Sequence, residues 1–213
     1  MRIVNRAILE DLKAGRHLRL NLGCGNKPRA DFYGVDQLDL PGVDIVANLN
    51  QPFTALPDNS VEAIYSRHTL EHVVNLLPLM RELHRVVRPG GQIEIIVPHF
   101  SNPYGFSDPT HVRFFGLYSF FYFSEECDQP RRKVPAFFLP ERFVVETVRI
   151  NPLRESFIGK AVGSLLKQYI NGNLLRLDWY ERCLCRLMPA DSIHFTLRPK
   201  KEVAVLLPAP HAA

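Results

Sequence analysis

A glycine turn and an acidic residue shortly after it are well suited to binding a ligand. The apolar run Leu18–Leu22 is typical of a buried strand, and the turn Gly23-Cys24-Gly25 follows it directly. Glycine permits a tight turn and lets the backbone approach a ligand without a Cβ in the way. Asp36 ends the next apolar run, where a carboxylate can accept two hydrogen bonds from a ribose diol. These residues predict a nucleoside-binding site.

The spacing within this motif argues against a dinucleotide. The segment from Gly25 to Asp36 is well below the roughly 20 residues of a dinucleotide-binding crossover. Pro28 stands where a third glycine would allow close packing of a helix on the strand. Because both departures disfavour a pyrophosphate cradle at a helix N-terminus, the sequence favours a nucleoside without phosphates. An NAD-dependent oxidoreductase is the weaker alternative.

Two histidines are candidate catalytic bases. His99 follows the apolar run Ile93–Val97, and His111 lies further along the same segment, three residues after Asp108. Transfer of a group to a hydroxyl needs a base, and histidine is the side chain best matched to pH 7. Asp108 can orient the imidazole of such a base. In the alternative interpretation Asp108 caps a turn and the backbone holds His111.

Apolar runs alternate with helical patterns in the first half of the chain, which predicts an α/β fold with a parallel sheet. A helix is expected from Leu76 to Val87. Ligands bind outside the carboxyl ends of the strands in such a sheet, and Asn48, His68 and His99 all follow strand ends. The expected strands are Leu18–Leu22, Phe32–Asp36, Val43–Leu49, Val61–Ser66, Ile93–Val97, Phe143–Ile150 and Ile193–Leu197.

Two later segments are less regular. Residues 98–140 are rich in proline and aromatic residues and predict a long functional loop, in which some side chains of Phe114–Phe123 would wall an acceptor pocket. Residues 151–190 contain two amphipathic helical patterns. We expect a helical cap, a contact with an anionic membrane surface, or a dimer contact through Trp179 and Tyr180. The basic residues of this segment are Lys160, Lys167, Arg176, Arg182 and Arg186.

Five segments, in chain order, resemble motifs of the SAM-dependent (S-adenosylmethionine-dependent) methyltransferase type 11 family. They are Leu20–Gly25, Tyr33–Asp36, Pro57–Val61, His68–His72 and Arg85–Gly91. The resemblance covers roughly residues 18–120. The departure at Lys27-Pro28 resembles a subgroup with a shortened first crossover, whose members look like enzymes of bacterial polysaccharide and cell-envelope pathways. It implies a class I, Rossmann-like fold whose seven-stranded, mostly parallel sheet has the order 3-2-1-4-5-7-6. The last-formed strand would be antiparallel.

The resemblance also implies which residues bind SAM. The glycine turn would line the methionine part, Asp36 would bind the ribose, and Asn48, where relatives often have aspartate, would face the adenine. Glu71 and His72 are assigned to capping and orienting the following helix. The implied cofactor-binding residues are Gly23, Cys24, Gly25, Asp36, Asn48, Leu49 and His68.

We therefore expect an enzyme that transfers a methyl group from SAM to a small-molecule, carbohydrate or lipid-linked cell-envelope acceptor, at oxygen or nitrogen. A non-catalytic SAM- or nucleoside-binding module is the alternative. The net charge of +4 without a basic stripe argues against a nucleic-acid partner. No carboxylate–histidine cluster shows ligand spacing, so no metal is expected.

The composition predicts a single globular domain over residues 1–213. Hydrophobic residues make up 46% and charged residues 23% of the chain, which is typical of a folded domain. No run approaches the roughly 20 apolar residues of a membrane span, and the N-terminus lacks a secretory pattern. We expect a cytoplasmic protein whose oligomeric state is open.

Overall fold

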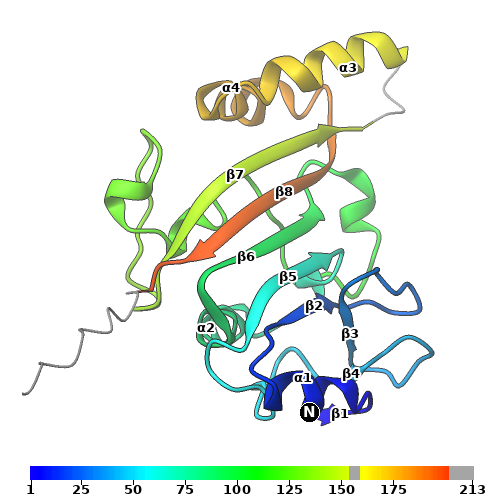
Figure 1. Cartoon of the computed structure of the whole chain (residues 1–213). Coiled ribbons are helices and arrows are strands. Elements are labelled where there is room, and N and C mark those ends of the chain that lie inside the picture. Colours follow the sequence, from blue (N-terminus) through cyan, green and yellow to red (C-terminus); the bar gives the residue numbers. More distant parts are fainter. Residues whose placement is uncertain (154–158, 202–213) are drawn as a thin grey trace, which may run out of the picture.

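The computed structural model describes residues 1–153 and 159–201, and its strands form one mixed sheet (Figure 1). The strands are β1 Arg2–Ile3, β2 Leu18–Leu22, β3 Tyr33–Asp36, β4 Ile45–Val46, β5 Val61–Arg67, β6 Val87–Pro98, β7 Phe143–Pro152 and β8 Ala190–Pro199. The helices are α1 Ala7–Lys13, α2 Leu76–Val86, α3 Gly159–Ile170 and α4 Leu174–Trp179. Single-turn elements are η1 Leu70–His72, η2 Pro103–Phe106, η3 Phe121–Phe123, η4 Glu126–Asp128 and the π-type η5 Tyr180–Leu184.

The strand order is β1-β4-β3-β2-β5-β6-β8-β7. Every predicted strand is present, and these strands lie in the predicted order 3-2-1-4-5-7-6. β8 runs antiparallel to both β6 and β7, as expected for the last-formed strand. The class I, Rossmann-like fold is therefore confirmed. The difference is an eighth strand, β1, which pairs antiparallel with β4 and is too short for a sequence pattern to reveal.

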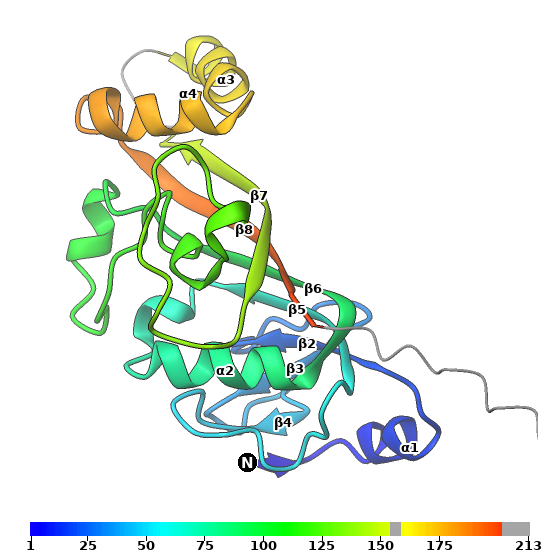
Figure 2. The ribbon, with the colours of Figure 1, turned by 90° about the vertical axis from the view of Figure 1, so that its left-hand side faces the viewer.

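One face of the sheet is covered by α2 and by part of the segment between β6 and β7 (Figure 2). The apolar stripe of α2 is buried here, because its three- and four-residue spacing places Leu79, Met80, Leu83 and Val86 on one side. The aromatic segment adds to the same core. Its buried members are Phe115, Phe120, Phe121 and Phe123. Of the phenylalanines in Phe114–Phe123 only Phe114 is exposed, so it is the one that remains to wall an acceptor pocket.

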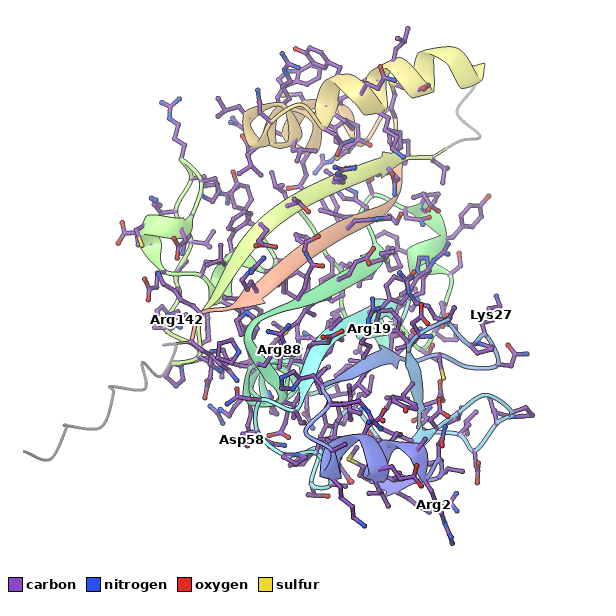
Figure 3. The ribbon with its side chains drawn as sticks, viewed as in Figure 1. Arg2, Arg19, Lys27, Asp58, Arg88 and Arg142 are labelled. Carbon is purple, nitrogen blue, oxygen red and sulfur yellow. The ribbon has the colours of Figure 1, made fainter. Side chains whose placement is uncertain are left out.

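The first crossover is short, as the sequence indicated. All residues between β2 and β3 are described, and none of them forms a helix. Instead the guanidinium of Arg29 lies 3.8 Å above the ring of Tyr65 on β5. Charged side chains line neighbouring strands nearby, where Arg19 and Arg88 approach Glu62 at 3.7 and 3.8 Å (Figure 3). Charged side chains of β2, β5 and β6 thus form a polar network on the part of the sheet near the first crossover, which contains no helix.

At the β7 edge of the sheet, α3 and α4 pack on β7 (Figure 1). Both helical patterns of the 151–190 segment are present, although residues 154–158 of it lie outside the described residues. Tyr180 is buried, and its hydroxyl donates to the Met188 carbonyl at 2.6 Å, so its proposed dimer contact is wrong. Within the described ranges, no helix combines the length and apolar character needed to cross a membrane.

Candidate functional site

A pocket of about 210 Å³ lies at the carboxyl ends of the central parallel strands. Its lining residues are Gly23, Asp36, Gln37, Ala47, Asn48, Leu49, Asn50, His68, Thr69, His72 and Val73. All the predicted cofactor residues except Cys24 and Gly25 therefore line one pocket. They come from the ends of β2, β3 and β5 and from the segment after β4, because parallel strands bring their carboxyl ends to the same edge.

The glycine turn requires glycine at both positions. Gly23 and Gly25 have φ angles of +66° and +53°, a region that other residues rarely adopt. A Cβ on Gly23 would lie 2.1 Å from Oγ1 of Thr69, whereas a Cβ on Gly25 would meet open space. The turn at Gly23 is thus packed against the end of β5, and the turn at Gly25 is open to a ligand.

Cys24 contributes no side chain to the pocket. Its sulfur is buried and lies 2.8 Å from where a Cβ on Gly34 would stand, so the thiol points into the fold. Burial, with the nearby charge of Asp36, raises the pKa of the Cys24 thiol to about 11. The thiol therefore stays protonated at neutral pH, and only the backbone of Cys24 is available to a ligand.

Asp36 holds the glycine turn and still has capacity for a ligand. Its Oδ2 accepts a hydrogen bond from the Gly25 N–H at 2.9 Å, and its Oδ1 accepts one from the Leu38 N–H at 3.1 Å. An ionised carboxylate has about four lone-pair sites, so each oxygen can accept once more. Asp36 can therefore bind two hydroxyls of a diol without releasing the turn.

Asn48 is also held by its neighbours. Its Oδ1 accepts from the Asn50 N–H at 2.9 Å, which closes a turn after β4, and from Nδ2 of Asn50 at 3.2 Å. Both lone pairs of Oδ1 are therefore used, and the Nδ2 amide of Asn48 remains for a ligand. An adenine amine is a donor, so Asn48 can accept from it only by giving up one of these two hydrogen bonds. Donation from Nδ2 to a ring nitrogen is the contact that the geometry favours.

His68 adopts an unusual backbone conformation at the end of β5. Its φ angle is +51°, a left-handed conformation that costs a non-glycine residue about 1–3 kcal/mol. The His68 N–H donates to the Ile96 carbonyl at 2.9 Å, which ties the turn to β6. Next to it, the Thr69 hydroxyl donates to the Leu22 carbonyl at 3.2 Å. Such strain is typical of functional sites.

The loop that carries His111 docks on the turn that carries His72. The Val112 N–H donates to the Glu71 carbonyl at 2.9 Å, and the Arg113 guanidinium donates to the Val73 carbonyl at 2.9 Å. These contacts bring the His111 ring to 4.8 Å from the ring of His72, which lines the pocket. His111 therefore lies beside the predicted cofactor site. The other candidate base, His99, does not.

Asp108 caps a turn, as one of the two interpretations predicts, and its carboxylate also lies near His111. Its Oδ1 accepts from the Thr110 N–H at 2.8 Å and from the Thr110 hydroxyl at 2.6 Å, which is a turn cap. Its Oδ2 lies 3.6 Å from Nε2 of His111. The Thr110 hydrogen bonds hold the pKa of the Asp108 carboxyl below its usual value. Meanwhile Nδ1 of His111 donates to the Gly105 carbonyl at 2.8 Å, so the backbone also orients this ring.

His99 is buried, and both of its ring nitrogens are engaged. Nδ1 accepts from the Ser101 N–H at 3.1 Å, so the ring hydrogen lies on Nε2, which donates to Glu181 at 3.2 Å. His99 is absent from the pocket lining. The ring therefore links the loop after β6 to η5, a geometry that leaves no nitrogen free to take a proton.

Sequence reasoning missed part of this site. Glu71 and His72 do not cap α2, because its N-cap residue is Asn75, which makes no side-chain cap. His72 and Thr69 line the pocket instead. His68 was predicted because it is a polar residue that follows a strand end, and the same reasoning applies to Thr69 and His72. His72 was not predicted to bind a ligand because it was assigned to capping the following helix.

The comparisons with known proteins agree with this geometry. The family model described as a methyltransferase domain matches residues 20–95. Residues 20–95 therefore resemble a methyltransferase domain. The expected type 11 family resemblance and SAM-dependent character are thereby confirmed for this part of the chain. The matched range contains every predicted cofactor residue and ends before the loop that carries His111.

Two curated relatives are similar to part of this chain. Phosphoethanolamine N-methyltransferase 3 of Arabidopsis thaliana is 30% identical over 107 residues, which is 40% of this chain and 21% of the relative. Phosphoethanolamine N-methyltransferase of Triticum aestivum is 30% identical over 109 residues, 41% of this chain and 21% of the relative. The chain thus spans about a fifth of the length of these relatives.

A solved structure shows the same fold over nearly the whole chain. The YcgJ protein from Bacillus subtilis aligns with a TM-score of 0.51 at 12% identity, covering 92% of this chain and 99% of that protein. At this identity the likeness concerns the fold alone.

Proposed function

We propose that this chain transfers the methyl group of SAM to a small polar acceptor. The observation that carries the proposal is the pocket of the methyltransferase domain, in which Asp36 both fixes the glycine turn and keeps free acceptor capacity. The open space at Gly25 admits the cofactor close to the backbone. Asp36 would bind the ribose, Asn48 the adenine ring, and His68 would flank the reacting end.

The reaction is a direct displacement. An oxygen or nitrogen of the acceptor attacks the sulfonium methyl, a new O–C or N–C bond forms, the C–S bond breaks, and S-adenosylhomocysteine leaves. The protein contributes mainly by holding both reactants in near-attack geometry. A hydroxyl acceptor must also lose its proton, whereas an amine can react in its neutral form. A base is therefore needed only for oxygen acceptors.

His111 and His72 are the residues that we propose for this proton. The Nδ1 hydrogen of His111 is held by the Gly105 carbonyl. Nδ1 of His72 lies 2.9 Å from the Thr110 hydroxyl, which itself donates to Asp108 and so accepts from His72. In a neutral ring the lone pair then lies on Nε2 of both residues, and Nε2 of His111 lies 3.6 Å from Oδ2 of Asp108. This cluster beside the pocket also favours an enzyme over a non-catalytic binding module.

The acceptor is proposed only as a class. The two curated relatives are named for N-methylation of phosphoethanolamine, a small polar molecule. Carbohydrate and cell-envelope acceptors, favoured by the resemblance to the short-crossover subgroup, belong to the same polar class. Methyl transfer to either oxygen or nitrogen is compatible with the pocket.

Calorimetry tests the cofactor, and a labelled-methyl assay tests the acceptor. We expect S-adenosylhomocysteine to bind and NAD not to bind, because the structure has no pyrophosphate-binding helix after β2. Transfer of a labelled methyl group from SAM should then be screened against phosphoethanolamine and nucleotide sugars. NAD binding more tightly than S-adenosylhomocysteine would contradict the proposal.

A further inference from the structure

Three side chains at the edge of the pocket form a cluster of metal-ligand type. Glu71, His72 and His111 each offer one ligand atom, and these atoms lie within 4.8 Å of one another. The cluster joins two segments that are distant in the chain, because the loop after β6 docks on η1 through the Val112 N–H and the Glu71 carbonyl. His72 also lines the cofactor pocket.

Both imidazoles are oriented as metal-binding histidines usually are. Such histidines donate one ring N–H to a carbonyl, carboxylate or hydroxyl, which fixes the ring and leaves the other nitrogen for the metal. His111 donates from Nδ1 to the Gly105 carbonyl, at 2.8 Å. His72 donates from Nδ1 to the Thr110 hydroxyl, at 2.9 Å, and that hydroxyl donates onward to Asp108. The nitrogens left for an ion are the two Nε2 atoms.

Glu71 supplies the independent observation. Its residue exposure is 1%, and its Oε2 atom has no hydrogen-bond partner among the residues that the structure describes. Its other oxygen, Oε1, lies 3.5 Å from Nδ1 of His68. A buried carboxylate oxygen is costly unless it is paired or coordinates an ion, so the free Oε2 needs a partner. A carboxylate oxygen of Glu71 lies within 4.8 Å of the ring nitrogens of His72 and His111, so an ion between these three groups would be such a partner.

We propose that Glu71, His72 and His111 bind a divalent transition-metal ion. Two imidazoles and one carboxylate are a donor set that suits zinc, manganese or iron better than magnesium or calcium, which prefer oxygen ligands alone. Zinc bonds of about 2.0–2.2 Å place tetrahedral ligand atoms about 3.4 Å apart. The three ligand atoms are now up to 4.8 Å apart, and rotation of the two imidazole side chains can bring them to this shorter distance.

A second cluster of metal-ligand type is less suited to bind an ion. Glu125, Cys127 and Asp128 also lie close together. Lys200 already pairs with both carboxylates there, at 2.5 and 2.9 Å from Glu125 and Asp128. An ion at this cluster would have to compete with the Lys200 ammonium. The exposed Cys127 thiol can still bind zinc adventitiously, so it must be removed in any test.

The site deepens the proposed function and, in its catalytic part, rests on it. Three protein ligands leave coordination positions open, as in catalytic metal sites. With an ion bound, the two Nε2 lone pairs are ligands and no longer bases. An oxygen of the acceptor at an open position would be held beside the cofactor pocket and would lose its proton to water more easily. The predicted substrate class is then an acceptor with a hydroxyl or another oxygen ligand close to the atom that is methylated.

The test measures metal binding by the full chain, separately from turnover. Chelator-treated protein carrying Cys127→Ser is titrated with zinc chloride by calorimetry, and with cobalt(II), whose visible absorption reports the ligands. We expect one equivalent of tight binding. Glu71→Gln and His111→Ala should each weaken it more than about 100-fold, since even loss of a hydrogen-bond partner of a ligand costs 10–100-fold. Thr110→Val removes the hydroxyl acceptor of His72 and leaves only the Thr110 carbonyl, 3.3 Å from Nδ1, so it should weaken binding less, by about 10-fold.

The control is His17→Ala, which removes an exposed histidine far from the cluster and should leave zinc affinity unchanged. Retained binding of S-adenosylhomocysteine shows that a variant is folded; if Glu71→Gln does not fold, His111→Ala carries the test. Absence of one-equivalent zinc binding, or binding that survives both variants, overturns the metal site. Zinc binding without S-adenosylhomocysteine binding contradicts the proposed function but leaves the metal site standing.

Discussion

The two sides of the pocket are built in different ways. The cofactor side consists of strand ends and the turns after them, and its contacts run between neighbouring strands, such as Gly25 to Asp36 and Thr69 to Leu22. The histidine side consists of a loop that docks on a single-turn helix through the backbone of Val112 and the side chain of Arg113. A rigid sheet edge holds the first side, whereas a few hydrogen bonds hold the second.

Because of this difference, we expect one side of the pocket to determine cofactor binding and the other to determine methyl transfer. Each hydrogen bond that docks the loop contributes about 0.5–1.5 kcal/mol, so the histidine side can shift without disturbing the sheet. Loops placed on a rigid scaffold commonly carry the residues that vary among enzymes of one fold. Substitutions on the cofactor side should therefore change cofactor affinity and stability, and substitutions on the histidine side should change turnover.

The largest expected effect is on turnover. If the acceptor is a hydroxyl, His111→Ala should lower turnover about 10²–10⁴-fold while leaving the affinity for S-adenosylhomocysteine unchanged. His99→Ala should instead lower the free energy of unfolding, because it breaks the buried contacts with Ser101 and Glu181. Steady-state kinetics and urea denaturation separate the two. Full activity of His111→Ala would remove this histidine from the mechanism and favour an amine acceptor.

The next effect is on cofactor affinity. Asp36→Ala should weaken S-adenosylhomocysteine by about 2–4 kcal/mol if both diol contacts are lost, which is roughly 30- to 1,000-fold in Kd. The matched control is Asp39→Ala, which removes an exposed carboxylate paired with Arg2 in the same region. Calorimetry measures both. Equal affinities for the two variants would show that Asp36 serves only to hold the glycine turn.

A smaller effect on stability tests the rigidity of the cofactor side. Gly23→Ala forces a Cβ to within 2.1 Å of Thr69 Oγ1 in addition to the strain of a positive φ. Gly15→Ala has nearly the same φ, +70°, with nothing within 4 Å of the new Cβ. Gly23→Ala should therefore be the more destabilising by about 1–3 kcal/mol in urea denaturation. Adding Thr69→Ala should recover part of that difference; no recovery would mean that the close contact is unimportant.

The same contrast explains what could be predicted from the sequence. The strands and the cofactor residues are local signals, since apolar runs define strands and the residue after each run reaches the shared edge. The pairing of His111 with His72 depends on loop docking, which no periodicity encodes. His99 also follows a strand end, but its burial beneath η5 depends on Glu181, which is distant in the chain. Strand-end position alone therefore cannot separate a structural histidine from a functional one.

The smallest predicted effect concerns the helices at the β7 edge, α3 and α4, with η5. They expose apolar side chains next to basic ones, the pattern of helices that lie at a membrane surface. The exposed apolar residues are Leu165, Tyr169, Leu174, Leu175 and Trp179, with Leu187 just after η5. The basic residues Lys167, Arg176, Arg182 and Arg186 are exposed beside them, while the Lys160 side chain lies outside the described residues. Among these, Arg182 is partly neutralised by Asp178, at 3.5 Å.

Vesicles containing anionic lipid test whether this surface docks on a membrane or only caps the sheet. Each basic residue near an anionic surface contributes about 1 kcal/mol, and salt should screen it. Replacing Arg176, Arg182 and Arg186 by glutamine should therefore reduce co-sedimentation at low salt. The control replaces the exposed Arg6, Lys13 and Lys27, which lowers the net charge equally at other places on the chain. Equal losses in both triple variants would indicate attraction to net charge alone, and no co-sedimentation at low salt would leave a cap or a dimer contact through Trp179.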